Sequence, residues 1–309
     1  MRKYLIRAGI TCGLAVLPLA AAGESFQGRL DASVWYGRGE VTFQSPNLDP
    51  LISSDLVYPF RGYLGEVQGE ALFSFQLGSL PAQAGLRGRL ARHIDLQGTS
   101  TDSDWTFGWR WGYSEHDSRT KLLIWDIDAV FSLFPFPAAG GPKVLNSLES
   151  GLLAGFGQER YRIRDRNGWG VYEGETVEFS GPVSTYNPDF SGPRIGAYLR
   201  SSPLARVTVR LEAVLIPALR AESEAHWLLR DYRFRQKAEG TGFNLNARID
   251  YALTDSFRVF ADIRRIDLNA DRRGRESGEE EGESYRDEPI VGWVRTRYTG
   301  YAVGASLLF

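Results

Sequence analysis

The stretch Leu123-Ile124-Trp125-Asp126-Ile127-Asp128-Ala129-Val130-Phe131-Ser132-Leu133 alternates between apolar and polar residues. Every odd-numbered position is apolar, whereas Asp126, Asp128 and Ser132 occupy even-numbered positions. A period of two residues is typical of a β-strand with one apolar face, because successive side chains point to opposite sides. The same alternation occurs at 63–77, 85–97 and 243–251, so the sequence predicts an all-β protein.

Two environments accept such strands. In a water-soluble sandwich the apolar faces pack together, whereas in a membrane β-barrel they face lipid and the charged faces line the lumen. The alternating runs are longer than the five or six residues usual for strands of globular proteins. They are long enough for a tilted strand to cross a bilayer. We therefore expect a transmembrane barrel, and a sandwich remains the alternative.

The connections between these runs alternate in length, which indicates ten strands with both ends on the short-turn side, as in bacterial outer-membrane barrels. The predicted short turns are 78–83, 134–142, 201–205 and 253–256, and the predicted long loops are 38–57, 98–119, 160–190, 222–240 and 268–290. The sequence thus predicts one antiparallel barrel domain over 23–309. Its last strand ends in Phe309, as is common in chains handled by the barrel-assembly machinery.

The N-terminal segment has the features of a secretory signal. Basic residues precede an apolar stretch, and three alanines end at Ala22, so we expect cleavage after residue 22. Cys12, the only cysteine, lies inside this segment, so the mature chain is predicted to lack disulfides, thiol nucleophiles and Cys-ligated metal. The 36 Lys and Arg nearly balance the 38 Asp and Glu, which argues against nucleic acid as a partner.

Two clusters of charged residues lie at the predicted outer rim. Asp102 and Asp104 are two residues apart, and Glu222, Glu224 and His226 have the same parity as the charged lumen residues earlier in their strand. A carboxylate can orient an imidazole as a general base, and two nearby carboxylates can hold a water molecule. The two clusters together predict a site that activates water against a peptide carbonyl.

Strict alternation through Leu96 would place Asp102 on the lipid-facing side of its strand. We therefore expect a β-bulge near Gly98 that resets the alternation. The remaining histidines, His93 and His116, are assigned to lumen packing and to a loop surface, respectively.

These clusters resemble motifs of the omptins, a family of ten-stranded outer-membrane endopeptidases. Residues 101–105, Thr-Asp-Ser-Asp-Trp, resemble the family's Asp-x-Asp pair followed by Trp. Residues 222–226, Glu-Ser-Glu-Ala-His, resemble its Asp-x-His pair, with Glu in place of Asp. Further likeness runs through 153–161, 192–196 and 257–268.

The resemblance implies roles for four residues. Asp102 and Asp104 would hold the attacking water, His226 would be the base, and Glu224 would orient His226. No metal or organic cofactor is implied. Glu224 is one methylene longer than the family's Asp, and displacing a catalytic group by about 1 Å can cost about a hundredfold in rate.

The resemblance also implies how substrate and lipid are bound. Glu222 and Glu40 would bind a basic side chain of a peptide substrate, and Arg160 matches a residue that binds lipopolysaccharide on the barrel exterior. Gln158, Asp189 and Glu239 differ from the rest of that lipid-binding motif.

Three functions remain open for a barrel of this kind. The first is an outer-membrane endopeptidase that cuts beside basic residues, with its active-site mouth facing the cell exterior. The second is a non-catalytic barrel that serves as an adhesin or structural protein. The third, less favoured, is a small channel, because ten strands leave a lumen that side chains can largely fill.

Overall fold

The computed structural model describes residues 25–46, 52–78, 80–133, 148–229, 231–280, 282–289 and 292–309. Within these ranges the chain forms a single antiparallel sheet of eleven strands. The strands are β1 (Ser25–Pro46), β2 (Ile52–Leu77), β3 (Leu80–Thr106), β4 (Trp109–Leu133), β5 (Glu149–Tyr172), β6 (Glu175–Leu204), β7 (Val207–Trp227), β8 (Tyr232–Ala252), β9 (Phe257–Glu280), β10 (Glu283–Glu288) and β11 (Trp293–Leu308). The predicted signal segment 1–22 and the predicted turn 134–142 lie outside the described residues.

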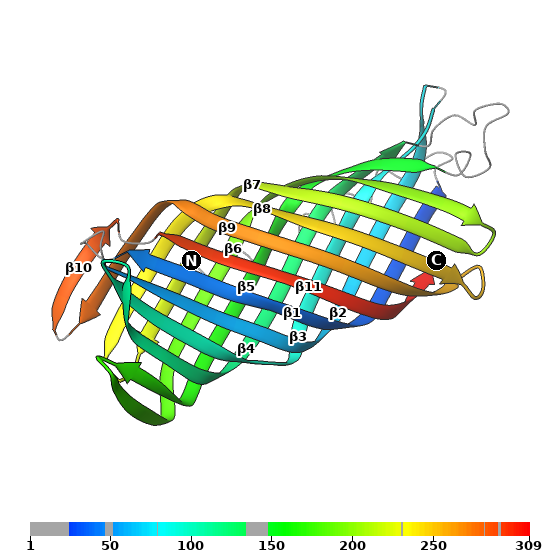
Figure 1. Ribbon diagram of the computed structural model, residues 1–309. Coiled ribbons are helices and arrows are strands. Elements are labelled where there is room, and N and C mark those ends of the chain that lie inside the picture. Colours follow the sequence, from blue (N-terminus) through cyan, green and yellow to red (C-terminus); the bar gives the residue numbers. More distant parts are fainter. Residues whose placement is uncertain are drawn as a thin grey trace.

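Ten of the described strands close into a ring, because β11 pairs with both β9 and β1 while β9 also pairs with β8. Figure 1 shows the resulting tilted barrel, with β10 at one end and the C terminus at the other. In the described part of the chain, β10 pairs only with the far end of β9. The predicted ten-stranded antiparallel barrel is therefore confirmed, with β10 as a short addition outside the ring.

The exterior of the barrel carries the apolar faces of the strands. Leu90 is 54% exposed, Ile127 is 52% exposed and Val303 is 68% exposed. A closed sheet with its oily faces outward satisfies its backbone hydrogen bonds internally and suits a lipid environment. This polarity excludes the water-soluble sandwich. Among the described residues there is no helix long and apolar enough to cross a membrane.

The lumen at the level of the apolar exterior is filled by ion pairs. Arg87 donates hydrogen bonds to Asp128 at 2.9 Å and to Glu212 at 2.6 Å. Arg194 reaches Asp126 at 2.8 Å, and all of these side chains are largely buried. Buried charges of both signs that hydrogen-bond one another avoid the cost of an unpaired ion in a medium of low dielectric constant.

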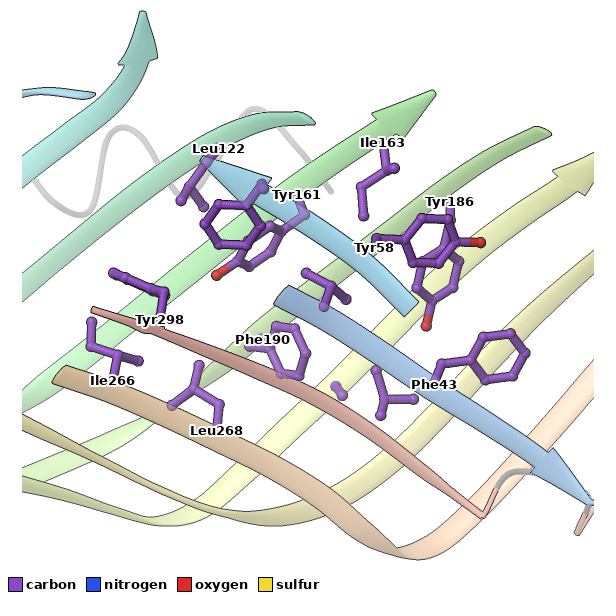
Figure 2. Packing of buried hydrophobic residues seen from close by; sticks show 14 of the residues in the cluster. Phe43, Tyr58, Leu122, Tyr161, Ile163, Tyr186, Phe190, Ile266, Leu268 and Tyr298 are labelled. Carbon is purple, nitrogen blue, oxygen red and sulfur yellow. The ribbon is translucent and has the colours of Figure 1, made fainter. Parts of the chain in front are cut away.

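On the side of this ionic layer that faces the end carrying β10 lies an apolar plug, which consists of aromatic and aliphatic side chains from several strands (Figure 2). Tyr58 and Tyr186 stack with ring centroids 5.3 Å apart, and the Phe43 ring lies 5.4 Å from that of Tyr186. Tyr161 and Phe190 meet edge to face at 6.0 Å. The plug fills the lumen between the ionic layer and the mouth of the barrel.

The polar stretches predicted as long loops are mostly strands. β3 runs to Thr106 and β5 runs to Tyr172, and each joins the next strand through a two-residue turn. In these turns Phe107–Gly108 and Glu173–Gly174 all have positive φ, as type I′ hairpin turns require. Polar composition here marks strands that pair with one another beyond the apolar exterior, and it does not mark irregular loops.

Breaking the ionic layer should destabilise the barrel. Asp128→Ala leaves Arg87 and Arg194 each short of a partner inside the lumen, and removing one member of a buried ion pair costs about 3–5 kcal/mol. Urea unfolding of the refolded barrel in detergent micelles measures this loss. The exposed Asp117, on the same strand, is the control, since Asp117→Ala should change stability by about 0.5 kcal/mol or less. Equal stabilities for the two variants would contradict this account of the lumen.

Candidate functional site

A cavity of about 340 Å³ opens at the mouth of the barrel, directly above the apolar plug. Leu56 and Tyr58 belong to both the plug and the cavity wall, so the plug is the floor of the cavity. The walls combine aromatic rings with carboxylates and small polar groups. The lining residues are Leu56, Tyr58, Ser100, Thr101, Asp102, Asp104, Trp111, Ser114, His116, Asp165, Tyr172, Phe179, Val183, Ser184, Trp227 and Leu229.

Asp102 and Asp104 line this cavity because β3 contains a β-bulge. Tyr63 and Leu64 are consecutive on β2 but pair with Asp95 and His93, so β3 carries one extra residue, Ile94. One inserted residue exchanges the two faces of a strand. The predicted reset is thus confirmed, but it lies at Ile94 and not near Gly98, and it turns Leu96 inward.

Beyond the bulge, the Asp pair lies across from small residues on the neighbouring strands. Asp102 is opposite Ser114 of β4, and Asp104 is opposite Ser54 of β2. Ser54 donates a hydrogen bond to Asp104 Oδ1. The first predicted motif is therefore an inward-facing pair of carboxylates at the mouth.

The second predicted motif faces the other way. Ile216 and Leu219 of β7 pair with Gly242 and Gly240 of β8, so β7 holds one residue more than β8 at Pro217–Ala218. This bulge reverses the alternation. Even-numbered residues of β7 face the lumen before the bulge and odd-numbered residues face it afterwards, beginning with Leu219, which is 1% exposed. The prediction that Glu222, Glu224 and His226 share the lumen face of this strand is wrong. Ser223, Ala225 and Trp227 point inward in their place.

On the outer face, Glu224 and His226 have different partners. Glu224 forms an ion pair with Arg235 at 3.1 Å, with side chains 66% and 76% exposed. His226 Nε2 lies 2.8 Å from Asp231 Oδ1, in the turn that leads into β8. The predicted orientation of His226 by Glu224 is therefore replaced by a contact with Asp231, and the two predicted clusters do not share a cavity.

The predicted substrate acids also lie on the outside. Glu40 of β1 is directly opposite Arg297 of β11, whose side chain pairs with Asp267 on the barrel exterior. Directly opposed residues in an antiparallel pair point to the same face, so Glu40 faces outward. Glu222 is exposed on β7, which β8, β9 and β11 separate from β1 around that side of the ring. The two acids do not form one pocket.

Arg160 lies on the exterior, as its parity predicts, and its charge is already paired. Its Nε is 3.2 Å from Asp189, its Nη2 donates to Gln158 at 3.3 Å, and Asp189 also pairs with Arg162 at 2.7 Å. Glu239, the third departure from the family's lipid-binding motif, pairs with Arg273 at 3.2 Å. The residues that differ from the family therefore neutralise part of the basic charge on this exterior surface.

Sequence reasoning missed a histidine inside the cavity. His116 was assigned to a loop surface, yet it lies on β4, is 7% exposed, and lines the cavity with Ser114. A signal for it exists in the alternation of residues 113–121, where the charged residues occupy odd positions and Ser114, His116 and Ser118 occupy even ones. That parity is shared with the inward Asp126 and Asp128 further along the strand.

Asp165 of β5 was missed in the same way, because the segment was expected to be a loop. It lines the cavity at 3% exposure and accepts a hydrogen bond from Ser184 at 2.8 Å. Burial raises the pKa of the Asp165 carboxyl above its usual range, since the charged form is costly away from water. Within the described residues there is no group of three or more His, Cys, Asp or Glu side chains arranged to hold a metal ion.

Fold and site together define a ten-stranded membrane β-barrel with an acidic, aromatic-walled cavity at its mouth. The described strands have the fold of an omptin: the crystal structure of the outer membrane protease OmpT from Escherichia coli matches with a TM-score of 0.71 and 12% identity, covering 94% of this chain and 99% of that chain. The translocator domain of the autotransporter NalP from Neisseria meningitidis reaches only 0.35, with 11% identity, over 98% of this chain and 95% of that chain. No protein-family model matches the sequence, and no curated protein shows significant similarity to it.

The buried Asp165 gives the barrel a pH-dependent stability. Because the folded pKa is raised above 3.8, the folded protein binds this proton more tightly than the unfolded chain does. The stabilising contribution is therefore present at low pH and is lost as the pH rises through the folded pKa. Asp165→Asn removes this titration while its amide oxygen can still accept from Ser184. We expect the stability of Asp165→Asn relative to wild type to increase from pH 4 to pH 8.

Unfolding midpoints in detergent at the two pH values measure this difference. Asp117→Asn, on an exposed position of the adjacent strand β4, is the matched control and should change stability little at either pH. A relative stability of Asp165→Asn that falls as the pH rises would contradict the burial of this carboxyl.

Proposed function

We propose that this protein is an outer-membrane barrel that binds a basic side chain of an extracellular peptide in its mouth cavity. One observation carries the proposal: Asp102 and Asp104 line the same cavity as Trp111, Tyr172 and Trp227. Carboxylates at hydrogen-bonding distance and aromatic faces are the two kinds of group that hold guanidinium and ammonium ions. The ligand is the basic peptide that was expected from the sequence. The residues proposed to bind it are those that line the mouth cavity, in place of Glu222 and Glu40.

The size and position of the cavity suit a single side chain. A volume of about 340 Å³ lies near the lower limit of ligand pockets, which run from about 300 to 1,000 Å³. Its floor is the apolar plug, so a ligand enters from the mouth and does not pass through the barrel. Arginine fits this environment better than lysine, because its planar guanidinium can stack on a ring and bind a carboxylate through two hydrogen bonds.

The extramembrane position of the cavity supports an external ligand. The lining residues lie next to the turns that join β3 to β4 and β5 to β6, and at the end of β7, where the strands extend beyond the apolar exterior. Figure 1 shows the hairpin β9–β10 at the same end of the barrel. In outer-membrane barrels the segments that project far beyond the apolar belt lie outside the cell, and the periplasmic end is short. We therefore place the mouth at the cell surface, with lipid around the apolar belt of the barrel.

Peptide-bond cleavage is a second candidate function. The fold likeness to OmpT and the presence of an imidazole, His116, in the cavity favour it. The mechanism expected from the sequence, with His226 as the base for a water held by the Asp pair, requires all three groups within hydrogen-bond reach. His226 lies on the outer face instead, so any cleavage would need another base.

Affinity for arginine peptides tests the first candidate. Asp102→Asn and Asp104→Asn should each weaken binding of a fluorescent arginine-containing peptide, because a hydrogen bond to a charged group contributes about 1.5–3 kcal/mol, or roughly ten- to a hundredfold in affinity. Glu224→Gln removes an acid from the outer face and serves as the matched control, with unchanged affinity. The peptide with norleucine in place of arginine should bind to none of these proteins. Loss of binding in Glu224→Gln alone would overturn the proposal.

The second candidate is tested by cleavage of dibasic peptides by the barrel in lipopolysaccharide micelles. Any cleavage by the wild type should persist at the same rate in His226→Ala, because His226 faces away from the cavity. A drop of a hundredfold or more in His226→Ala, the size expected for loss of a general base, would instead place His226 at the reacting bond.

A further inference from the structure

Ser114 and His116 form a hydrogen-bonded pair inside the mouth cavity. His116 Nε2 lies 2.9 Å from Ser114 Oγ, and His116 Nδ1 lies 3.0 Å from the backbone oxygen of Asn167. A carbonyl oxygen can only accept, so Nδ1 carries a proton, and the neutral ring then accepts the Ser114 hydroxyl proton at Nε2. Because both ring nitrogens are engaged, His116 can act on a bound molecule only through Ser114 Oγ.

The backbone that supplies the carbonyl is strained. Asn167 has a φ of 51° although it is not glycine, and it forms a β-bulge in β5, where His116 and Asp117 pair with Gly168 and Arg166. Gly168 has a φ of 138°, and a Cβ there would lie 2.0 Å from the Glu115 oxygen and 2.6 Å from His116 Nδ1. Backbone conformations of this kind are strained and cluster at functional sites. The hydrogen bond from His116 Nδ1 to the Asn167 oxygen holds the imidazole in one orientation and one tautomer.

Ser114 is also next to the acidic pair that we propose binds a basic side chain. It lies directly opposite Asp102, and directly opposed side chains on one face of an antiparallel pair have Cβ atoms about 4.5–5.5 Å apart. A basic side chain held by Asp102 and Asp104 would therefore lie next to the Ser114 hydroxyl, and the peptide or ester that carries it would enter the same cavity. A hydroxyl bonded to an oriented imidazole, beside a site for the neighbouring side chain, has the arrangement of an activated nucleophile.

We infer that Ser114 is a nucleophile with His116 as its general base, which makes the mouth cavity an acyl-transfer site for peptides or esters that carry a basic side chain. The inference rests on the proposed function of the same cavity. Ser114 Oγ attacks the carbonyl carbon while its proton passes to His116 Nε2. The bond to the leaving amine or alcohol breaks as His116 returns that proton to it. Water then attacks the acyl-serine while His116 takes a proton from it. The bond from the acyl carbon to Ser114 Oγ breaks as His116 returns that proton to Oγ, and the carboxylic acid leaves.

A fluorophosphonate probe that carries a guanidinium group tests this chemistry on the folded barrel. Ser114 Oγ should displace fluoride and form a stable phosphonyl ester, which mass spectrometry locates. Labelling should disappear in Ser114→Ala and slow by about a hundredfold or more in His116→Gln, the loss expected for a general base. Ser118→Ala is the matched control, since Ser118 is buried on the same face of β4 and does not line the cavity. Labelling of Ser114→Ala at the wild-type rate would overturn the inference.

A cysteine at position 114 gives a second readout that does not depend on turnover. With Cys12 replaced by serine, Ser114→Cys carries a single thiol, and a neighbouring imidazole lowers the pKa of a thiol. Alkylation by iodoacetamide at pH 6 should be roughly tenfold faster for Ser114→Cys than for Ser114→Cys/His116→Gln. Equal rates for the single and double variants would overturn the pairing of Ser114 with His116.

The two proposals fail in different ways. Wild-type barrel that binds the arginine peptide but resists the fluorophosphonate would overturn the nucleophile and leave the basic-peptide site standing. Labelling that depends on Ser114 but is equally fast with a probe lacking the guanidinium group supports the nucleophile and removes the preference for basic side chains.

Discussion

A β-strand has two faces, and a single inserted residue exchanges them for the rest of its length. In this barrel that constraint decides which polar side chains reach the mouth. The bulge at Ile94 turns Asp102 and Asp104 into the cavity, whereas the bulge at Pro217–Ala218 turns Glu224 and His226 out of it. Both motifs are present in the sequence, yet the one on β3 faces into the barrel and the one on β7 faces out of it.

The filling of the lumen explains why the cavity is closed at its base and open only at the mouth. Ion pairs such as Arg87 with Asp128 and Glu212 occupy the level of the apolar exterior, and the aromatic plug around Tyr58 and Tyr186 covers them. The plug gives the cavity an apolar floor of low dielectric constant, which strengthens the interaction of any bound cation with the carboxylates above it. A packed lumen of this kind suits binding or chemistry at the mouth better than conduction through the barrel.

Much of the fold could be predicted from the sequence, because alternation in segments such as 123–133 reports directly on the two faces of a strand. The extent of the strands could not, since polar composition looks the same in a loop and in a strand that pairs beyond the membrane. The site depends on bulges, and a bulge leaves little signal in the alternation when apolar residues occupy both faces of the strand, as in 213–219 around Pro217. The inward position of His116 was not predicted because 98–119 was expected to be a loop, although Ser114 and Ser118 share its parity.

The alternation of β7 beyond its bulge is the most direct test of this account. Single cysteines at positions 222 to 226, in a chain with Cys12 replaced by serine, can be compared for their rate of reaction with a membrane-impermeant maleimide on the folded barrel. Fast reaction at 222, 224 and 226, with slow reaction at 223 and 225, is the expected pattern, because Ser223 and Ala225 are 4% and 6% exposed. The opposite alternation would place Glu224 and His226 inside the mouth and contradict the account.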